Sequence, residues 1–199
     1  MAKELQYIDI DGSPGGNQDW FTDPMMKLGG CAAVCACDSA IYFARSFGLG
    51  ALCPFEAAKP SKEDFIQLSR LMKPYLRPRW EGVNKPQIYI DGFGQFMADR
   101  GVGSVTMSAL SGESAYEQAE AAVIRQIYAL LPVPCLVLDH SDKAFSDYEW
   151  HWFMLIGYDK GDGDFRVLAV TYGKTQWLSL KGLWNTGCTP KGGLVLYKI

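Results

Sequence analysis

The sequence has no long apolar run and no block of positive charge. It contains nothing close to the ~20 consecutive apolar residues of a membrane-spanning helix, so we expect no membrane span and no membrane partner. The formal net charge of its 199 residues is -3, which gives nucleic-acid binding no electrostatic support. The N-terminal residues Met1 to Leu5 also lack the apolar segment of a secretory signal.

Cysteine is present, but without the regular spacing of a small disulfide-linked scaffold. The six cysteines are Cys31, Cys35, Cys37, Cys53, Cys135 and Cys188. Because no secretory signal precedes them, we expect free thiols in a reducing cytoplasm. No paired histidine or second Cys-x-x-Cys accompanies Cys35 and Cys37, so core packing is favoured over a zinc site. We expect neither a metal nor a cofactor.

The composition, 48% hydrophobic and 21% charged, is typical of a globular domain. The first thirty residues are rich in glycine and proline and are predicted to be loops. Residues 31–47 form a predicted helix that is apolar or small on nearly every face, which indicates a buried central position. Further helices are predicted over residues 61–76, 92–100 and 114–131.

After Pro132 the pattern changes from helix to strand. Strands are predicted over residues 133–139, 150–158, 165–171, 175–180 and 194–198. The acidic segment 159–164 is interpreted as a hairpin turn rather than a calcium loop, since the glutamate that closes such a loop is missing. We therefore predict one α+β domain, with a helical part over about 31–131 and a sheet part over about 133–199.

Gly29-Gly30-Cys31 places a thiol at the first turn of the predicted central helix. The unpaired N–H groups and the positive end of the helix dipole favour a thiolate there, and thiolate is the reactive form. The two glycines let a substrate backbone approach closely. The alternative is that Cys31 is a small apolar residue at the start of a core helix.

The chain contains only two histidines that can serve as a base for such a thiol. His151 lies in an apolar strand, where an imidazole needs a polar partner; the alternative is a core histidine without a catalytic role. His140 lies in a polar loop and is expected to be solvated. Trp150 and Trp152 alternate with His151, so we expect them to face the opposite side of the sheet.

Three features together resemble the papain-like cysteine peptidase superfamily. They are Gln18, the Gly-Gly-Cys31 that opens a helix, and the strand that begins at His151 and ends in Gly-Tyr-Asp159. The second half of the chain is most similar to bacteriocin-processing (C39-type) peptidases. The resemblance covers roughly residues 17–45 and 120–186, and it implies a papain-like fold in which a central nucleophile helix packs on an antiparallel sheet.

The resemblance also implies roles for individual residues. Cys31 would attack an acyl carbon as part of a thiolate–imidazolium pair, and His151 would carry the proton. The Cys31 backbone N–H and the Gln18 side chain would donate to the oxyanion; an ordinary loop glutamine is the alternative for Gln18. The family holds its imidazole with Asn or Asp, whereas the matching place here falls at Val170 or Thr171, of which only Thr171 is polar.

This departure leaves three interpretations of the site. The protein works as a dyad with Thr171 as the orienting residue, it takes a carboxylate such as Asp139 or Asp147 from elsewhere, or it has lost activity. The expected function is a cysteine peptidase-like hydrolase that cleaves a peptide or other amide through an acyl-enzyme. The alternatives are an acyltransferase that uses the same Cys–His pair and a non-catalytic binding module. No feature of the sequence indicates an oligomeric state.

Asp38 interrupts the apolar central helix. A buried carboxylate needs hydrogen bonds or a charged partner, and Arg45 lies two turns further along the same side. We expect Asp38 to brace the loops around this helix, with Arg45 as its candidate partner, rather than to take part in catalysis.

Overall fold

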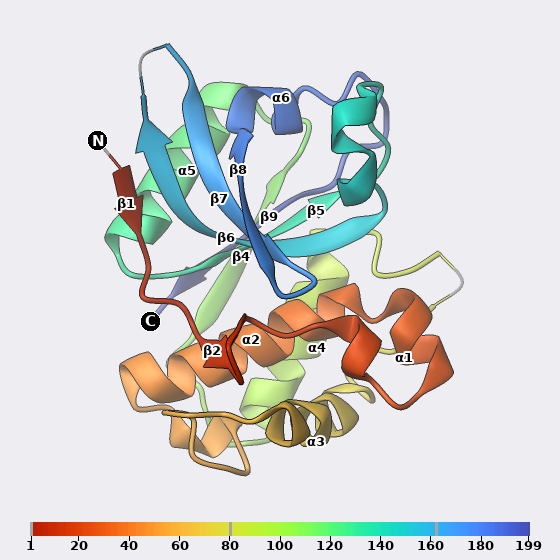
Figure 1. The fold of residues 1–199 in the computed structure, drawn as a ribbon, viewed down its shortest axis with the longest axis vertical. Coiled ribbons are helices and arrows are strands. Elements are labelled where there is room, and N and C mark those ends of the chain that lie inside the picture. Colours follow the sequence, from red (N-terminus) through yellow and green to blue (C-terminus); the bar gives the residue numbers. More distant parts are fainter. Residues whose placement is uncertain (1, 80, 162) are drawn as a thin grey trace.

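The structure, a computed structural model, describes residues 2–79, 81–161 and 163–199. Its helices α1 to α4 gather on one side of the molecule, and the large sheet with α5 and α6 forms the other side (Figure 1). The sheet has seven strands, and all of its strand pairs are antiparallel. This confirms the predicted α+β class.

The strands of the large sheet follow a spatial order that differs from the chain order. That order is β4 (Thr106–Ser111), β9 (Gly193–Lys198), β5 (Val133–Val137), β6 (His151–Lys160), β7 (Phe165–Thr171) and β8 (Lys174–Ser179). Strand β1 (Ala2–Glu4) pairs with the second half of β6, beyond the end of β5. A separate ladder joins β2 (Asp9–Ile10) to β3 (Ser13–Pro14).

The connections between helices range from the single residue Gly30 to long segments that contain strands. The helices are α1 (Pro24–Gly29), α2 (Cys31–Phe47), α3 (Lys62–Met72), α4 (Pro86–Ala98), α5 (Tyr116–Tyr128) and α6 (Leu180–Trp184). Short 3-10 turns lie at η1 (Gln18–Trp20), η2 (Gly50–Leu52) and η3 (Lys143–Tyr148). No described helix has both the length and the apolar character that crossing a bilayer requires.

Helix α2 is the central helix, as its apolar sequence predicts. Every residue from 35 to 44 is buried, and α2 packs against β6 of the sheet. The helix ends at Gly48, whose φ of +70° lies in the left-handed region that favours glycine. Cys31, the first residue of α2, lies outside this buried stretch and is partly exposed.

Strands β7 and β8 are joined by a two-residue turn at Tyr172-Gly173. Both residues have positive φ, 49° and 69°, as a two-residue hairpin turn of type I′ requires. The turn fixes the register in which Thr171 pairs with Lys174. Thr171 is consequently the last residue of β7, at the same end of the sheet as the start of β6.

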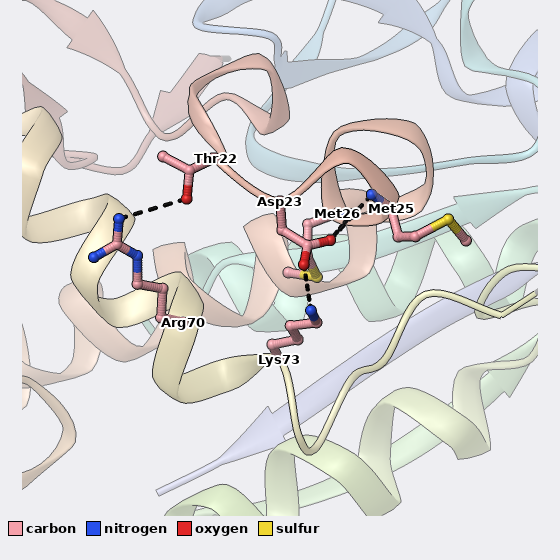
Figure 2. Close-up of polar contacts among 6 residues, drawn as sticks. All are labelled: Thr22, Asp23, Met25, Met26, Arg70 and Lys73. Carbon is pink, nitrogen blue, oxygen red and sulfur yellow. Dashed lines mark hydrogen bonds and ion pairs between the residues drawn. The ribbon is translucent and has the colours of Figure 1, made fainter.

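The expectation that the first thirty residues are loops is wrong for Ala2–Glu4, which forms β1, and for Pro24–Gly29, which forms α1. The Asp23 carboxylate caps this helix by accepting the backbone N–H groups of Met25 and Met26, and proline is favoured at a helix start. Figure 2 shows the same carboxylate ion-paired with Lys73, which follows α3. This pair and the cap together lower the pKa of Asp23.

Other elements depart from the predicted boundaries for identifiable reasons. Strand β4 lies within the part expected to be helical; it is an edge strand whose exposed side chains give no apolar alternation. Helix α4 begins at Pro86 rather than at residue 92, with proline in its first turn. Helix α6 begins at a Ser179 cap within the part expected to be sheet. The predicted 159–164 turn includes Asp162, which lies outside the described residues.

Candidate active site

Cys31 is the first residue of α2, separated from the end of α1 by Gly30 alone. Only glycine fits at the junction, because a Cβ on Gly30 would lie 2.3 Å from the Met26 carbonyl oxygen and 2.7 Å from Cε2 of Phe21. No side chain caps α2, so its first N–H groups stay available near the thiol. The local sequence therefore places Cys31 at a helix N-terminus that no side chain caps.

The thiol lies on a cleft of about 770 Å³. The helical side contributes Gln18, the α1 helix and the connection between α3 and α4. The sheet side contributes the ends of β5 and β6, the residues before β6, and Tyr172. Cys31 and His151 both line this cleft, although they lie far apart in the sequence.

His151 is the first residue of β6, and its ring is held on two sides. Its Nε2 lies 2.6 Å from Oγ1 of Thr171 at the end of the neighbouring strand. The Tyr172 ring stacks on the imidazole with centroids 5.0 Å apart and planes 3° from parallel. Among the described residues, Nδ1 has no hydrogen-bond partner. The ring therefore offers Nδ1, and not Nε2, to a further group.

The backbone of β6 brings the two candidate residues together. The Trp152 backbone, one residue after His151, lies near enough to the Cys31 sulfur to oppose the rise in the pKa of that thiol. The thiol also faces the N–H groups of Ala32 and of Cys31 itself. The sulfur is thus surrounded by donors from the helix end and from the histidine strand.

The electrostatics of the pair differ from what the resemblance implies. Burial raises the pKa of the Cys31 thiol, and the three backbone N–H groups oppose that effect only in part. Burial also lowers the pKa of His151 to about 4, and its partner Thr171 carries no charge that would stabilise an imidazolium. At neutral pH the resting pair is a thiol beside a neutral imidazole, and not a thiolate–imidazolium pair.

Gln18 lies in η1 on the edge of the cleft and is about nine-tenths buried, at 9% exposure. Its Nε2 donates to the Lys27 carbonyl oxygen over 3.0 Å, and since a carbonyl can only accept, this contact fixes the orientation of the amide. The Oε1 atom is buried and has no hydrogen-bond partner among the described residues. The unpartnered atom is thus an acceptor, whereas the resemblance implies an oxyanion donor.

A small internal space of about 10 Å³ lies behind the pair. Its lining includes the polar side chains of Gln18, Cys31, Asp38, His151 and Thr171. The volume is about that of a single water probe. Cys31 and Asp38 therefore line the same internal space.

Asp38 braces the N-terminal segment against α2. Its carboxylate accepts the Gly16 backbone N–H over 2.9 Å and the Tyr7 hydroxyl over 3.0 Å. Burial raises the pKa of Asp38 to about 7. The expected partnership with Arg45 is wrong, because the guanidinium instead donates to the backbone carbonyls of Gln6 and Tyr7. Both side chains thus hold the segment that leads to Gln18.

The alternative carboxylates do not hold the imidazole. Asp139 accepts the indole N–H of Trp150 over 2.8 Å, and Asp147 lines the cleft. Within the described chain, neither hydrogen-bonds to His151, whose one side-chain partner is Thr171. The interpretation in which Asp139 or Asp147 takes the place of the family's Asn or Asp beside His151 is therefore wrong.

Two expectations about the neighbouring aromatic and histidine residues are wrong. Trp150 lies outside the strand, with φ of +50° and 53% exposure, so the alternation that would turn it away from the cleft does not apply. Trp152 is buried and donates its indole N–H to the Val83 carbonyl. His140 is buried rather than solvated, because its ring accepts from the Asp142 N–H and donates to the Gly182 carbonyl.

The remaining cysteines show no metal arrangement. Among residues 2–79, 81–161 and 163–199, no three His, Cys, Asp or Glu side chains are grouped so as to hold a metal ion. Cys35 and Cys37 are buried in the core, and all six thiols are free.

Comparison of the chain with protein-family models, with curated proteins and with solved structures finds no match. The assignment of a site therefore depends on the geometry described above. Sequence reasoning missed one contributor, Tyr172. The signal was present, because Tyr172-Gly173 directly after a strand is a two-residue hairpin turn that places the ring beside Thr171.

Proposed function

We propose that this protein is a papain-like thiol hydrolase that cleaves an amide bond through an acyl-enzyme on Cys31. The observation that carries the proposal is the placement of Cys31 and His151 on one cleft, with Nε2 of His151 bonded to Thr171. That bond leaves Nδ1 as the atom that can receive the thiol proton. A buried cysteine helix packed against an antiparallel sheet that carries the histidine supports the papain-like assignment.

The reaction begins with a neutral pair. As the sulfur attacks the carbonyl carbon, the thiol proton passes to Nδ1 of His151 and an S–C bond forms. The N–H groups at the uncapped end of α2 stabilise the oxyanion. Collapse breaks the C–N bond, and the proton moves from the imidazolium to the departing amine. Water then attacks the thioester with His151 as base, which releases the acid and regenerates the thiol.

Thr171 is the positioning residue in this scheme. Its hydroxyl oxygen accepts from Nε2–H and so keeps the lone pair on Nδ1. It supplies no negative charge, which makes the imidazolium less stable than beside a carboxylate. With a His151 pKa of about 4, the base is in its neutral form throughout the physiological range.

The acyl-enzyme can be tested without the natural substrate. We expect p-nitrophenyl acetate to release a burst of p-nitrophenol and to leave an acetyl group on Cys31, located by peptide mass mapping. His151→Ala should slow acetylation by roughly 10²-fold, since general-base assistance contributes about 10²–10⁴. Cys53→Ala, which removes a half-buried thiol away from the cleft, is the matched control and should not change the burst.

The same experiment separates the alternatives. A hydrolase turns over in water, while an acyltransferase turns over only when an amine such as glycinamide is added. Acetylation spread evenly over the six cysteines would contradict both and favour a binding module. We propose a peptide or related amide as the substrate and the cytoplasm as the compartment.

A further inference from the structure

The cleft gathers exposed apolar side chains. In the part of the chain that the structure describes, eight large apolar side chains are exposed, and four of these line the cleft: Met25, Leu28, Trp150 and Tyr172. Large apolar side chains grouped on one exposed surface indicate a binding site. Their position around Cys31 indicates that the ligand is the molecule on which the thiol acts.

Trp150 is held in a fixed orientation at the edge of the cleft. Its indole N–H donates to Asp139 over 2.8 Å, while 53% of the residue stays exposed. Asp139 thus occupies the polar edge of the ring and leaves its face available. The face of an indole is the preferred aromatic surface for a Lys or Arg side chain.

The charged residues of the cleft are mostly acidic. Among the described residues that line it, Glu81, Asp147 and Glu149 are acidic and Arg79 is the single cation. Asp147 and Glu149 lie three residues and one residue before Trp150 in the chain. Carboxylates in a cleft concentrate their field there and favour a positively charged ligand.

Gln18 provides an independent indication of the ligand. Its Oε1 is buried, lacks a partner among the described residues, and belongs to a side chain that lines the same cleft. A buried acceptor without a donor is costly, and a substrate N–H removes that cost. The carboxylates and the amide oxygen are all acceptors, so they complement a ligand rich in N–H groups.

We propose that the cleft recognises a basic peptide or amide whose Lys or Arg side chain lies on Trp150 near Asp147 and Glu149, while a substrate N–H donates to Gln18. This inference rests on the proposed function, because it assigns the substrate of the same cleft. It selects a cationic substrate class from all possible amides.

Three chloroacetyl probes test the charge preference on the full-length protein. Chloroacetyl-lysine amide, its neutral norleucine counterpart and its glutamate counterpart each alkylate Cys31, and each rate is divided by that of glutathione with the same probe. We expect the lysine probe to react about tenfold faster than the norleucine probe, and the glutamate probe to react slowest. The preference should shrink as NaCl rises from about 50 to about 500 mM.

Matched variants locate the preference. Asp147→Asn combined with Glu149→Gln, and separately Trp150→Leu, should bring the lysine-to-norleucine ratio close to one. Asp91→Asn combined with Glu117→Gln removes the same charge from exposed sites in α4 and α5 and should keep the ratio. N-methylation of the probe amide should slow wild type but not Gln18→Leu.

The outcomes distinguish the two proposals. Rapid alkylation of Cys31 with equal rates for all three probes overturns the recognition of a basic substrate and leaves the hydrolase intact. Alkylation of Cys31 no faster than that of glutathione, unchanged by His151→Ala, overturns the hydrolase, whereas a lysine preference in the same data still supports the recognition. Circular dichroism of each variant verifies that a lost preference does not reflect unfolding.

Discussion

Replacement of Thr171 by valine isolates the single hydrogen bond that orients His151. Valine keeps the volume and the β-branched shape that suits a strand end, and it removes only the hydroxyl 2.6 Å from Nε2. The buried Nε2–H is then left without a partner, which costs about 1–3 kcal/mol. That cost corresponds to roughly 5- to 150-fold in a rate or an equilibrium constant.

The expected result is a parallel loss of reactivity and stability. We expect acetylation of Cys31 by p-nitrophenyl acetate to slow by at least about fivefold, and urea unfolding to show a loss of about 1–3 kcal/mol. Thr171→Ser keeps a hydroxyl and should restore most of the rate. Thr175→Val makes the same change at an exposed position on β8 and should have no effect. Thr171→Val protein that reacts like wild type would refute the orienting role.

Three further predictions address the surroundings of the pair. Tyr172→Ala should uncover His151 and raise its pKa from about 4 towards the ordinary 6.5, as followed by NMR titration of the imidazole; an unchanged pKa would contradict shielding by the ring. Gly30→Ala should destabilise the protein because its new Cβ meets the backbone at 2.3 Å, whereas Gly103→Ala, which has open space, should not; equal thermal unfolding temperatures would contradict the steric argument. Asp38 and His151 should affect stability with opposite signs. Burial raises the pKa of Asp38 from 3.8 to about 7, so its stabilising contribution is present at low pH and is lost as pH rises through about 7. Burial lowers the pKa of His151 from 6.5 to about 4, so its contribution is present above pH 6.5 and is lost as pH falls through about 4. The stability of His151→Ala relative to wild type should therefore fall as pH rises from 4 to 7. The stability of Asp38→Asn relative to wild type should rise over the same range. Identical urea midpoints across this range in all three proteins would contradict both assignments.

The elements with a strong local pattern were predictable from the sequence. Helix α2 is apolar on all sides and ends at Gly48, and β7 was predicted with the bounds that the structure has, Phe165–Thr171. Ser61 and Asp64 form a capping box at the start of α3, where the sequence predicts a helix from residue 61. Each of these signals is local, so no tertiary contact was needed to read it.

The elements that depend on distant contacts were not predictable. Strand β4 has mostly exposed side chains, and its pairing with β9 makes it a strand. Trp150 turns into the cleft because of a positive φ that no periodicity reveals. The burial of His140 depends on a carbonyl contributed by Gly182 of α6.

The candidate site likewise combines features that the local sequence reveals with features that depend on tertiary contacts. The helix-start cysteine and the strand histidine were identified as a possible pair from residue type and context. The orientation of the Gln18 amide, the Tyr172 stack and the neutral state of the pair depend on three-dimensional burial and partners. These features distinguish a thiol that His151 deprotonates during attack from a preformed thiolate–imidazolium pair.

The most direct measurement of the central claim is the rate at which iodoacetamide labels Cys31 at pH 6, compared between wild type and His151→Ala. Labelling is resolved by peptide mass mapping, so that Cys53 and Cys188 serve as internal references. If His151 takes the proton from the thiol, Cys31 is labelled fastest of the six in wild type and falls to the level of the references in the variant. Equal labelling of Cys31 in the two proteins would contradict the pairing of this thiol with this imidazole.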